Sequence, residues 1–291
     1  MIYRYNENNK SLKFITIPDK YTSIGKYAFQ NHYNLRSIII PDSVKEIGAG
    51  AFLSCSKLST ITISTSVNEI KDGAFAHCSK LSSIIIPDFV NEISRETFKY
   101  CSNLTSVIIP TSISEIGDYA FKCCYNLSSI TIPNSVSEIG DYAFSDCHNL
   151  TSVIIPTSVS EIGDYAFEGC SKLSSITIST LITKIGDHAF KGCPKLSSEN
   201  TSTSVNKIST NTFKDHPKLT SITISSSINK ISTNTFDSHP KLTSIPTSNS
   251  VSEPNYKVLL QAYKNVSQQY PVLFKVFEHE VLRLDPNFKF D

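Results

Sequence analysis

The sequence predicts a repeat solenoid, in which each unit of 23 residues forms one turn and successive turns stack along one axis. Three columns of residues support this fold class: Phe recurs every 23 residues from Phe29 to Phe236, Leu from Leu12 to Leu242, and Ile from Ile24 to Ile231. No insertion or deletion interrupts ten successive units. A unit of this length cannot bury an apolar face alone, so neighbouring units must share one continuous core.

The first half of each unit has the pattern of a short β-strand. In the unit that begins at Leu127, Ile130 and Ile132 alternate with Ser129 and Thr131. An alternation of period two indicates a strand with one buried face. A proline follows directly and ends the strand, because it has no N–H to donate to a sheet ladder. We therefore expect one short parallel strand per unit, about 4.8 Å from the strand of the next unit.

The second half of the unit returns the chain to its starting side. Val136 and Ile139 are expected to point into the core, and Gly140 permits a turn. Phe144 and Cys147 then fit one short helical turn on the side opposite the strand.

The two ends of the chain depart from the repeat. Residues 1–11 are predicted to form an N-terminal edge, residues 12–253 the solenoid of ten units plus a partial one, and residues 254–291 a helical C-terminal cap. Leu259 and Tyr263 belong to an apolar helical face in that last segment. A cap is expected because the last core layer needs a cover. The alternative is a helix that docks a partner.

One unit near the end of the array carries polar residues at core positions. Glu199 and Thr201 stand where other units have inward-pointing strand residues. Because an unpaired buried carboxylate is costly, this strand is expected to fray or to turn Glu199 outward.

The complete unit reads L-x-x-I-x-I-P-x-S-V-x-x-I-G-x-x-A-F-x-x-C. This pattern resembles the BspA-type leucine-rich repeat over Leu12 to about Glu253. The resemblance implies a leucine-rich-repeat array of the kind found in bacterial and protist surface proteins that mediate adhesion. It therefore implies binding more than catalysis. Ser replaces the Asn of the commonest leucine-rich repeats in five units: Ser43, Ser66, Ser112, Ser135 and Ser158.

Composition and motifs agree with a binding protein that is not an enzyme and needs no cofactor. The formal net charge of +1 gives no general attraction to nucleic acid, and no Gly-rich phosphate loop or nucleophile elbow is found. No stretch approaches the roughly 18 apolar residues of a membrane span, and the N-terminus lacks the apolar stretch of a signal peptide. The residues alone thus indicate a cytoplasmic protein, whereas the resemblance implies a cell-surface or secreted one.

The outward positions of the strands form the candidate binding face. Repeat arrays commonly bind ligands on the sheet surface, and the expected ligand is a protein or a surface glycan. The alternative function is an intracellular scaffold whose C-terminal segment docks a partner. The candidate face comprises Ser83, Ile85, Ser106, Ile108, Ser129, Thr131, Ser152, Ile154, Ser175 and Thr177.

The cysteines are predicted to be structural. Seven occupy one repeat column and should be buried and unreactive: Cys55, Cys78, Cys101, Cys124, Cys147, Cys170 and Cys193. Cys123 lies outside that column and is expected to be exposed. No C-x-x-C pair is present, so the sequence predicts no zinc site. His77 and His148 flank column cysteines, but they are expected to be exposed turn residues and not catalytic bases.

An acidic stripe runs along a third column and changes sign near the end of the array. A solvated face that keeps the array soluble is the simplest interpretation. Recognition of a basic partner, or weak Ca²⁺ binding, is the functional alternative. The stripe comprises Glu46, Glu69, Glu92, Glu115, Glu138 and Glu161, followed by Lys184, Lys207 and Lys230, with a second row of Asp118, Asp141, Asp164 and Asp187.

Overall fold

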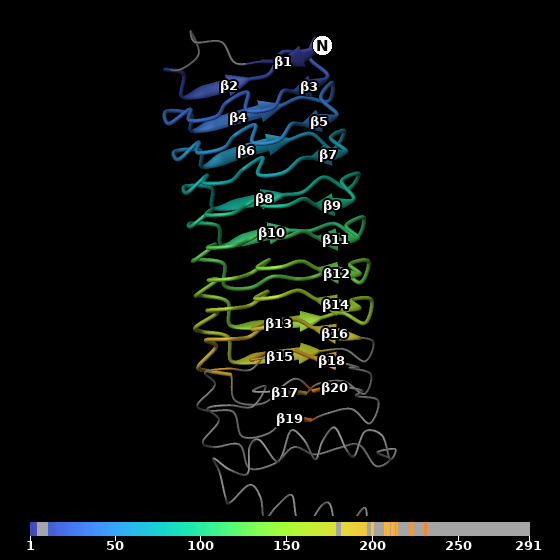
Figure 1. Cartoon of the computed structure of the whole chain (residues 1–291). Coiled ribbons are helices and arrows are strands. Elements are labelled where there is room, and N and C mark those ends of the chain that lie inside the picture. The colour runs from blue at the N-terminus through green and yellow to red at the C-terminus, as the bar shows by residue number, and fades with distance from the viewer. Residues whose placement is uncertain are drawn as a thin grey trace, which may run out of the picture.

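The computed structural model is a solenoid whose turns stack as parallel rungs (Figure 1). It describes residues 1–4, 11–178 and 182–196, together with the short pieces 199–200, 207–209, 211–212, 214, 222–223 and 230–231. A rung here means one 23-residue unit. The fold class predicted from the repeat is confirmed.

The longer strands form a parallel ladder on one side of the rungs, to the left of the two-residue strands in Figure 1. They are grouped into three sheets, with orders β2-β4-β6, β8-β10 and β13-β15-β17-β19. Their bounds are β2 (Phe14–Thr16), β4 (Ser37–Ile40), β6 (Thr60–Ile63), β8 (Ser83–Ile85), β10 (Ser106–Ile108), β13 (Ser152–Ile155), β15 (Ser175–Ile178), β17 (Glu199–Asn200) and β19 (Ile222–Thr223).

A second parallel ladder of two-residue strands, mostly Glu-Ile or Lys-Ile, follows each longer strand along the chain. It forms two sheets, β1-β3-β5-β7 and β9-β11-β12-β14-β16-β18-β20. The strands are β1 (Ile2–Tyr3), β3 (Ser23–Ile24), β5 (Glu46–Ile47), β7 (Glu69–Ile70), β9 (Glu92–Ile93), β11 (Glu115–Ile116), β12 (Glu138–Ile139), β14 (Glu161–Ile162), β16 (Lys184–Ile185), β18 (Lys207–Ile208) and β20 (Lys230–Ile231). The sequence predicted only one strand per unit, so this second ladder was missed.

The core is a column of stacked phenylalanine rings. Neighbouring rings from Phe29 to Phe190 have centroids 5.1–5.7 Å apart and lie within 15° of parallel. All of these rings are buried. The column continues into β1, where the ring of Tyr3 stacks on Phe29 at 5.1 Å. The repeat therefore gives each ring from Phe52 to Phe167 a phenylalanine ring on both sides.

The predicted helical turn opposite the strand is wrong: the described residues contain no α-helix. Instead, this side of the rung consists of successive tight turns, in which N–H groups donate to carbonyls three residues back, as from Ser145 to Tyr142 and from Cys147 to Phe144. Two residues per rung adopt left-handed backbone, for example Tyr142 (φ 56°) and Asp146 (φ 60°). These residues interrupt the right-handed dihedrals that a helix needs. We call this part of each rung the turn side.

Hydroxyl side chains connect the rungs and explain the abundance of Ser and Thr. Ser137 donates both its N–H (2.8 Å) and its Oγ (3.0 Å) to the carbonyl of Ser114. Ser160 does the same to the carbonyl of Ser137, with its Oγ at 3.2 Å. A carbonyl oxygen has two lone pairs, so each hydroxyl fills the acceptor site that the backbone leaves open.

Glycine at the end of the short strand permits close contact between rungs. A Cβ on Gly140 would lie 2.7 Å from the backbone nitrogen of Asp118 in the preceding rung. A side chain at this position would require the two rungs to shift apart, because real Cβ atoms do not approach backbone so closely.

The unit that has Glu199 and Thr201 at expected core positions still forms a strand, β17. β17 pairs with β15 and with β19, so the expected fraying at Glu199 is wrong for the backbone. Thr201 and the predicted cap at residues 254–291 lie outside the described residues. No helix in the part that the structure describes could cross a membrane.

Candidate interaction surface

The structure exposes every residue of the predicted binding face. The ten side chains from Ser83 to Thr177 all point to solvent, while the alternate residues point into the core. Ser83 lies opposite Ser106, and Ile85 opposite Ile108, in the register of β8 and β10. This geometry makes the residues available for contact.

An apolar row runs through this face. Ile85, Ile108 and Ile154 are 66%, 59% and 70% exposed. Ile39 precedes them in the same column, and Thr62, Thr131 and Thr177 are other members of it. Such large exposed aliphatic side chains contribute nothing to the core and are available for burial against a ligand.

The face is divided at one rung. Residues 128–133 form no strand, so Ser129 and Thr131 are not part of a ladder. The alternation is nevertheless retained, because Ile130 and Ile132 are buried while Ser129 and Thr131 are exposed. Eight of the ten residues therefore lie on two sheets, on β8 and β10 and on β13 and β15, and the other two lie on the irregular rung between them.

The acidic stripe lies on the second ladder, where like charges face each other. Glu115 is in register with both Glu92 and Glu138. Partial burial, and then the charges of Glu138 and Glu92, raise the pKa of Glu115. At the end where the sign changes, Lys184 Nζ lies 3.5 Å from Glu161 Oε2. The acidic stripe therefore ends where lysine replaces glutamate in this column.

The neighbouring aspartate row has a structural role. The N–H of Asp141 donates to Asp118 Oδ1 (2.8 Å), and the N–H of Asp164 donates to Asp141 Oδ1 (2.7 Å). Each carboxylate therefore satisfies a backbone donor of the next rung. Among the described residues, no group of three or more acidic, cysteine or histidine side chains is arranged to hold a metal ion.

The seven column cysteines are buried, as predicted, and all are free thiols. Each thiol donates to the carbonyl of a Phe 26 residues earlier, as from Cys147 to Phe121 (3.3 Å) and from Cys55 to Phe29 (3.0 Å). Burial raises the pKa of Cys55 and of Cys101 to about 12. A raised pKa keeps these thiols protonated, whereas a nucleophilic cysteine needs a lowered pKa.

The prediction that Cys123 is exposed is wrong. Its side chain is only 4% exposed, and its Sγ lies 3.8 Å from Asp146 Oδ2. Burial raises the pKa of the thiol, although hydrogen bonds with Tyr125 and Tyr100 act against this. Cys123 occupies the second left-handed position of its rung (φ 60°), which the predicted helical turn did not contain.

The two flanking histidines stack on tyrosines of the turn side. His77 stacks on Tyr100 at 4.5 Å and His148 on Tyr125 at 5.1 Å. Both are exposed, as predicted. The neighbouring thiol Cys78 is directed into the core, toward the carbonyl of Phe52. The arrangement therefore provides no Cys/His pair.

A hollow on the turn side, lined by Tyr27, Gly73 and Arg95 among others, was not predicted. The signal in the sequence was the presence of Gly50 and Gly73 in a column that holds Tyr in four other rungs.

Comparison with known proteins agrees with the repeat geometry. The sequence profile described as "BspA type Leucine rich repeat region (6 copies)" matches residues 1–128 and 114–243. No curated protein is significantly similar.

Several solved structures are similar. A leucine-rich repeat protein from Bacteroides ovatus is 26% identical, with a TM-score of 0.50 over 84% of this chain and 82% of that one. The leucine-rich repeat protein of T. pallidum is 28% identical, with a TM-score of 0.50 over 63% of this chain and 78% of that one. A leucine-rich cell surface protein from Faecalibacterium prausnitzii is 30% identical, with a TM-score of 0.45 over 85% of this chain and 81% of that one.

Proposed function

Because the chain belongs to the BspA-type leucine-rich repeat family, we propose that it is a non-catalytic adhesion protein whose longer strands present the face that binds a protein ligand. The family supports a surface or interaction role. The exposed isoleucine row supports the choice of face, and it is the observation that carries the proposal.

The isoleucine row suits a protein ligand for an energetic reason. Complete burial of one such side chain contributes about 1.5–3 kcal/mol. Ile85, Ile108 and Ile154 already expose most of their surface, and their strands are held in register by the neighbouring rungs. Little conformational entropy is therefore lost on binding, which favours affinity. The Ser rows beside the isoleucines provide a polar surround of the kind found around interface cores.

The remaining chemistry supports binding over catalysis. All eight thiols are buried, and the pKa values of Cys55, Cys101 and Cys123 are shifted upward. The paired charges near the sheet are exposed ion pairs, such as Lys71 Nζ with Glu46 Oε1 at 2.9 Å. Surface pairs of this kind contribute little and need no functional explanation.

The test compares the labelled wild-type chain with the triple variant Ile85→Ser/Ile108→Ser/Ile154→Ser on cultured cell layers and on an array of purified extracellular proteins. We expect saturable wild-type binding and at least tenfold weaker binding by the triple variant. The variant Tyr33→Ser/Tyr125→Ser removes exposed rings from the turn side and should bind like wild type. Equal binding by the wild-type chain and the isoleucine variant would contradict the proposal, as would no wild-type binding on any surface.

A chain that ends at residue 253 tests the alternative function. If residues 254–291 dock the partner, as in the scaffold hypothesis, this shorter chain loses binding while the isoleucine variant keeps it. The adhesion proposal predicts the reverse.

A further inference from the structure

A column of stacked tyrosines runs along the turn side, at the first left-handed position of each rung. Tyr119 and Tyr142 have ring centroids 4.9 Å apart, Tyr142 and Tyr165 4.6 Å, and Tyr165 and His188 4.7 Å. All four residues have φ of 56–57°. The position therefore accepts an aromatic residue in the left-handed conformation and stacks its ring on the next rung.

The column is interrupted at three successive rungs, where Gly50, Gly73 and Glu96 take the place of tyrosine. The ring of Tyr27 extends over Gly50, because a Cβ added there would lie 2.3 Å from Tyr27 Cε1. Gly73 differs: an added Cβ would meet nothing closer than Ala76 Cβ, at 3.9 Å. One ring position is thus filled from the preceding rung, and the position at Gly73 is open.

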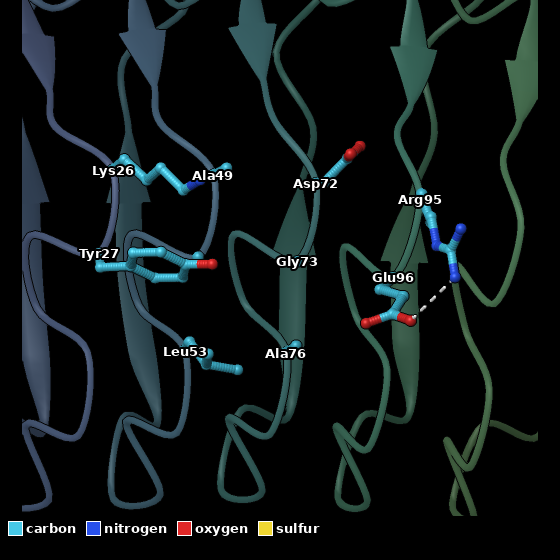
Figure 2. A pocket seen from close by; sticks show the side chains of 10 residues that line it. Lys26, Tyr27, Ala49, Leu53, Asp72, Gly73, Ala76, Arg95 and Glu96 are labelled. Atoms are coloured by element: carbon cyan, nitrogen blue, oxygen red, sulfur yellow. Dashed lines mark ion pairs between the residues drawn. The ribbon is translucent and has the colours of Figure 1, made fainter.

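The open position forms a hollow of about 270 Å³ (Figure 2). The Tyr27 ring forms one wall, Leu53 and Ala76 lie beneath it, and Arg95 and Glu96 form the opposite wall. An enclosed apolar space of roughly 150 Å³ is enough to hold benzene. The hollow therefore has room for a single aromatic side chain.

The charges around the hollow favour an uncharged ring. Lys26 and Asp72 lie on the rim, and Arg95 Nη2 is 3.7 Å from Glu96 Oε1. Two cations and two anions balance, so neither sign of ligand charge is selected. The cations already lie over rings: Lys26 Nζ is 5.1 Å from the Tyr27 centroid and Arg95 Cζ 5.3 Å from that of Tyr119. An aromatic ring in the hollow would lie between the Tyr27 ring and the Arg95 guanidinium group. Ring stacking and cation–π contacts would both favour its binding.

We infer that the hollow at Gly73 is a binding site for one aromatic side chain of a protein partner, which takes the open ring position between Tyr27 and Arg95. The site lies on the turn side and involves none of the residues of the sheet face. It therefore goes beyond the proposed function and does not depend on it.

The probe is N-acetyltryptophanamide, a neutral aromatic side chain with blocked backbone ends. The chain contains no Trp, so indole fluorescence reports the probe alone. We expect a saturable blue shift and a rise in anisotropy, with a dissociation constant on the order of 0.1–1 mM for so small a ligand. N-acetylleucinamide should not compete.

The variant Gly73→Tyr should fill the site with the chain's own ring. It should fold, because Gly73 has φ of 60° and tyrosine occupies the same column at 56–57°. We expect at least tenfold weaker binding of the probe. The matched control Ser54→Tyr adds the same ring at the other left-handed position (φ 61°), where Tyr100 stands in another rung (φ 59°), and should bind like wild type.

Tyr27→Ser tests the aromatic wall without filling the hollow, and should weaken binding at least fivefold. The inference is overturned if the wild-type chain does not bind the probe, if N-acetylleucinamide competes equally, or if both Gly73→Tyr and Tyr27→Ser bind as wild type does. Loss of binding in Ser54→Tyr as well as in Gly73→Tyr would also overturn it, because the effect would then not belong to this hollow. None of these outcomes bears on the isoleucine face.

Discussion

Replacement of one core ring measures how much the phenylalanine column stabilises the solenoid. Phe144 is 0% exposed, and its ring stacks on Phe121 at 5.3 Å and on Phe167 at 5.1 Å. Phe→Ala in a core costs about 3–5 kcal/mol, and each aromatic pair adds about 0.5–1.5 kcal/mol beyond area burial. Since Phe144 has two such partners, we expect Phe144→Ala to lower the free energy of unfolding by about 4–5 kcal/mol.

Phe144→Leu separates stacking from burial. Leucine refills most of the volume and loses both ring contacts, so we expect a cost of about 1–3 kcal/mol. Ile154→Ala, at a side chain that is 70% exposed, serves as the control and should stay within about 0.5 kcal/mol of wild type.

Urea unfolding gives these free energies, and native-state hydrogen exchange shows where the loss occurs. Rungs contact only their neighbours, so protection should fall first in the rungs of Phe121, Phe144 and Phe167. Unfolding of Phe144→Ala at the same urea concentration as Ile154→Ala would refute the reasoning, because the column would then contribute no more than the surface.

Three further predictions concern the thiols and the contact between rungs. All eight cysteines, Cys123 included, should resist a thiol reagent in the native chain and react in denaturant; fast native labelling of any of them would contradict their burial. The unfolding free energy should fall between about pH 9 and 12, because unfolded thiols ionise near 9.0 while folded Cys55 and Cys101 keep their protons to about 12; a flat urea-unfolding profile over that range would count against it. Gly140→Ala should cost about 1–3 kcal/mol, since its Cβ would lie 2.7 Å from the Asp118 nitrogen; wild-type stability in thermal unfolding would show that the rungs can separate there.

The period of the sequence was sufficient to predict the core and the exposed sheet face. The Phe and Cys columns are buried because fixed spacing gives their members the same surroundings, so one correct assignment holds for every rung that the structure describes from Phe29 to Phe190. The alternation at Ile130 and Ile132 likewise predicted burial correctly even where no strand forms.

Backbone conformation on the turn side could not be predicted in the same way. Apolar spacing around Phe144 fits a helical turn, but Tyr142 and Asp146 adopt left-handed backbone, which side-chain periodicity does not encode. The burial of Cys123 follows from that conformation and was missed with it. Glycine at positions 50 and 73 was the available signal, since glycine favours positive φ.

The hydroxyl ladder also bears on how such a gene can change length. From Ser114 to Thr183, each rung donates to the preceding rung through the same hydroxyl position that accepts from the following rung, as Ser137 does between Ser114 and Ser160. Recombination that duplicates or deletes one whole repeat in frame within these rungs would therefore leave the new junction with matched donors and acceptors. Features that single out particular rungs would instead be displaced relative to one another. The open ring position at Gly73 and the isoleucine row are such features, and their separation along the axis would change by a whole number of repeats.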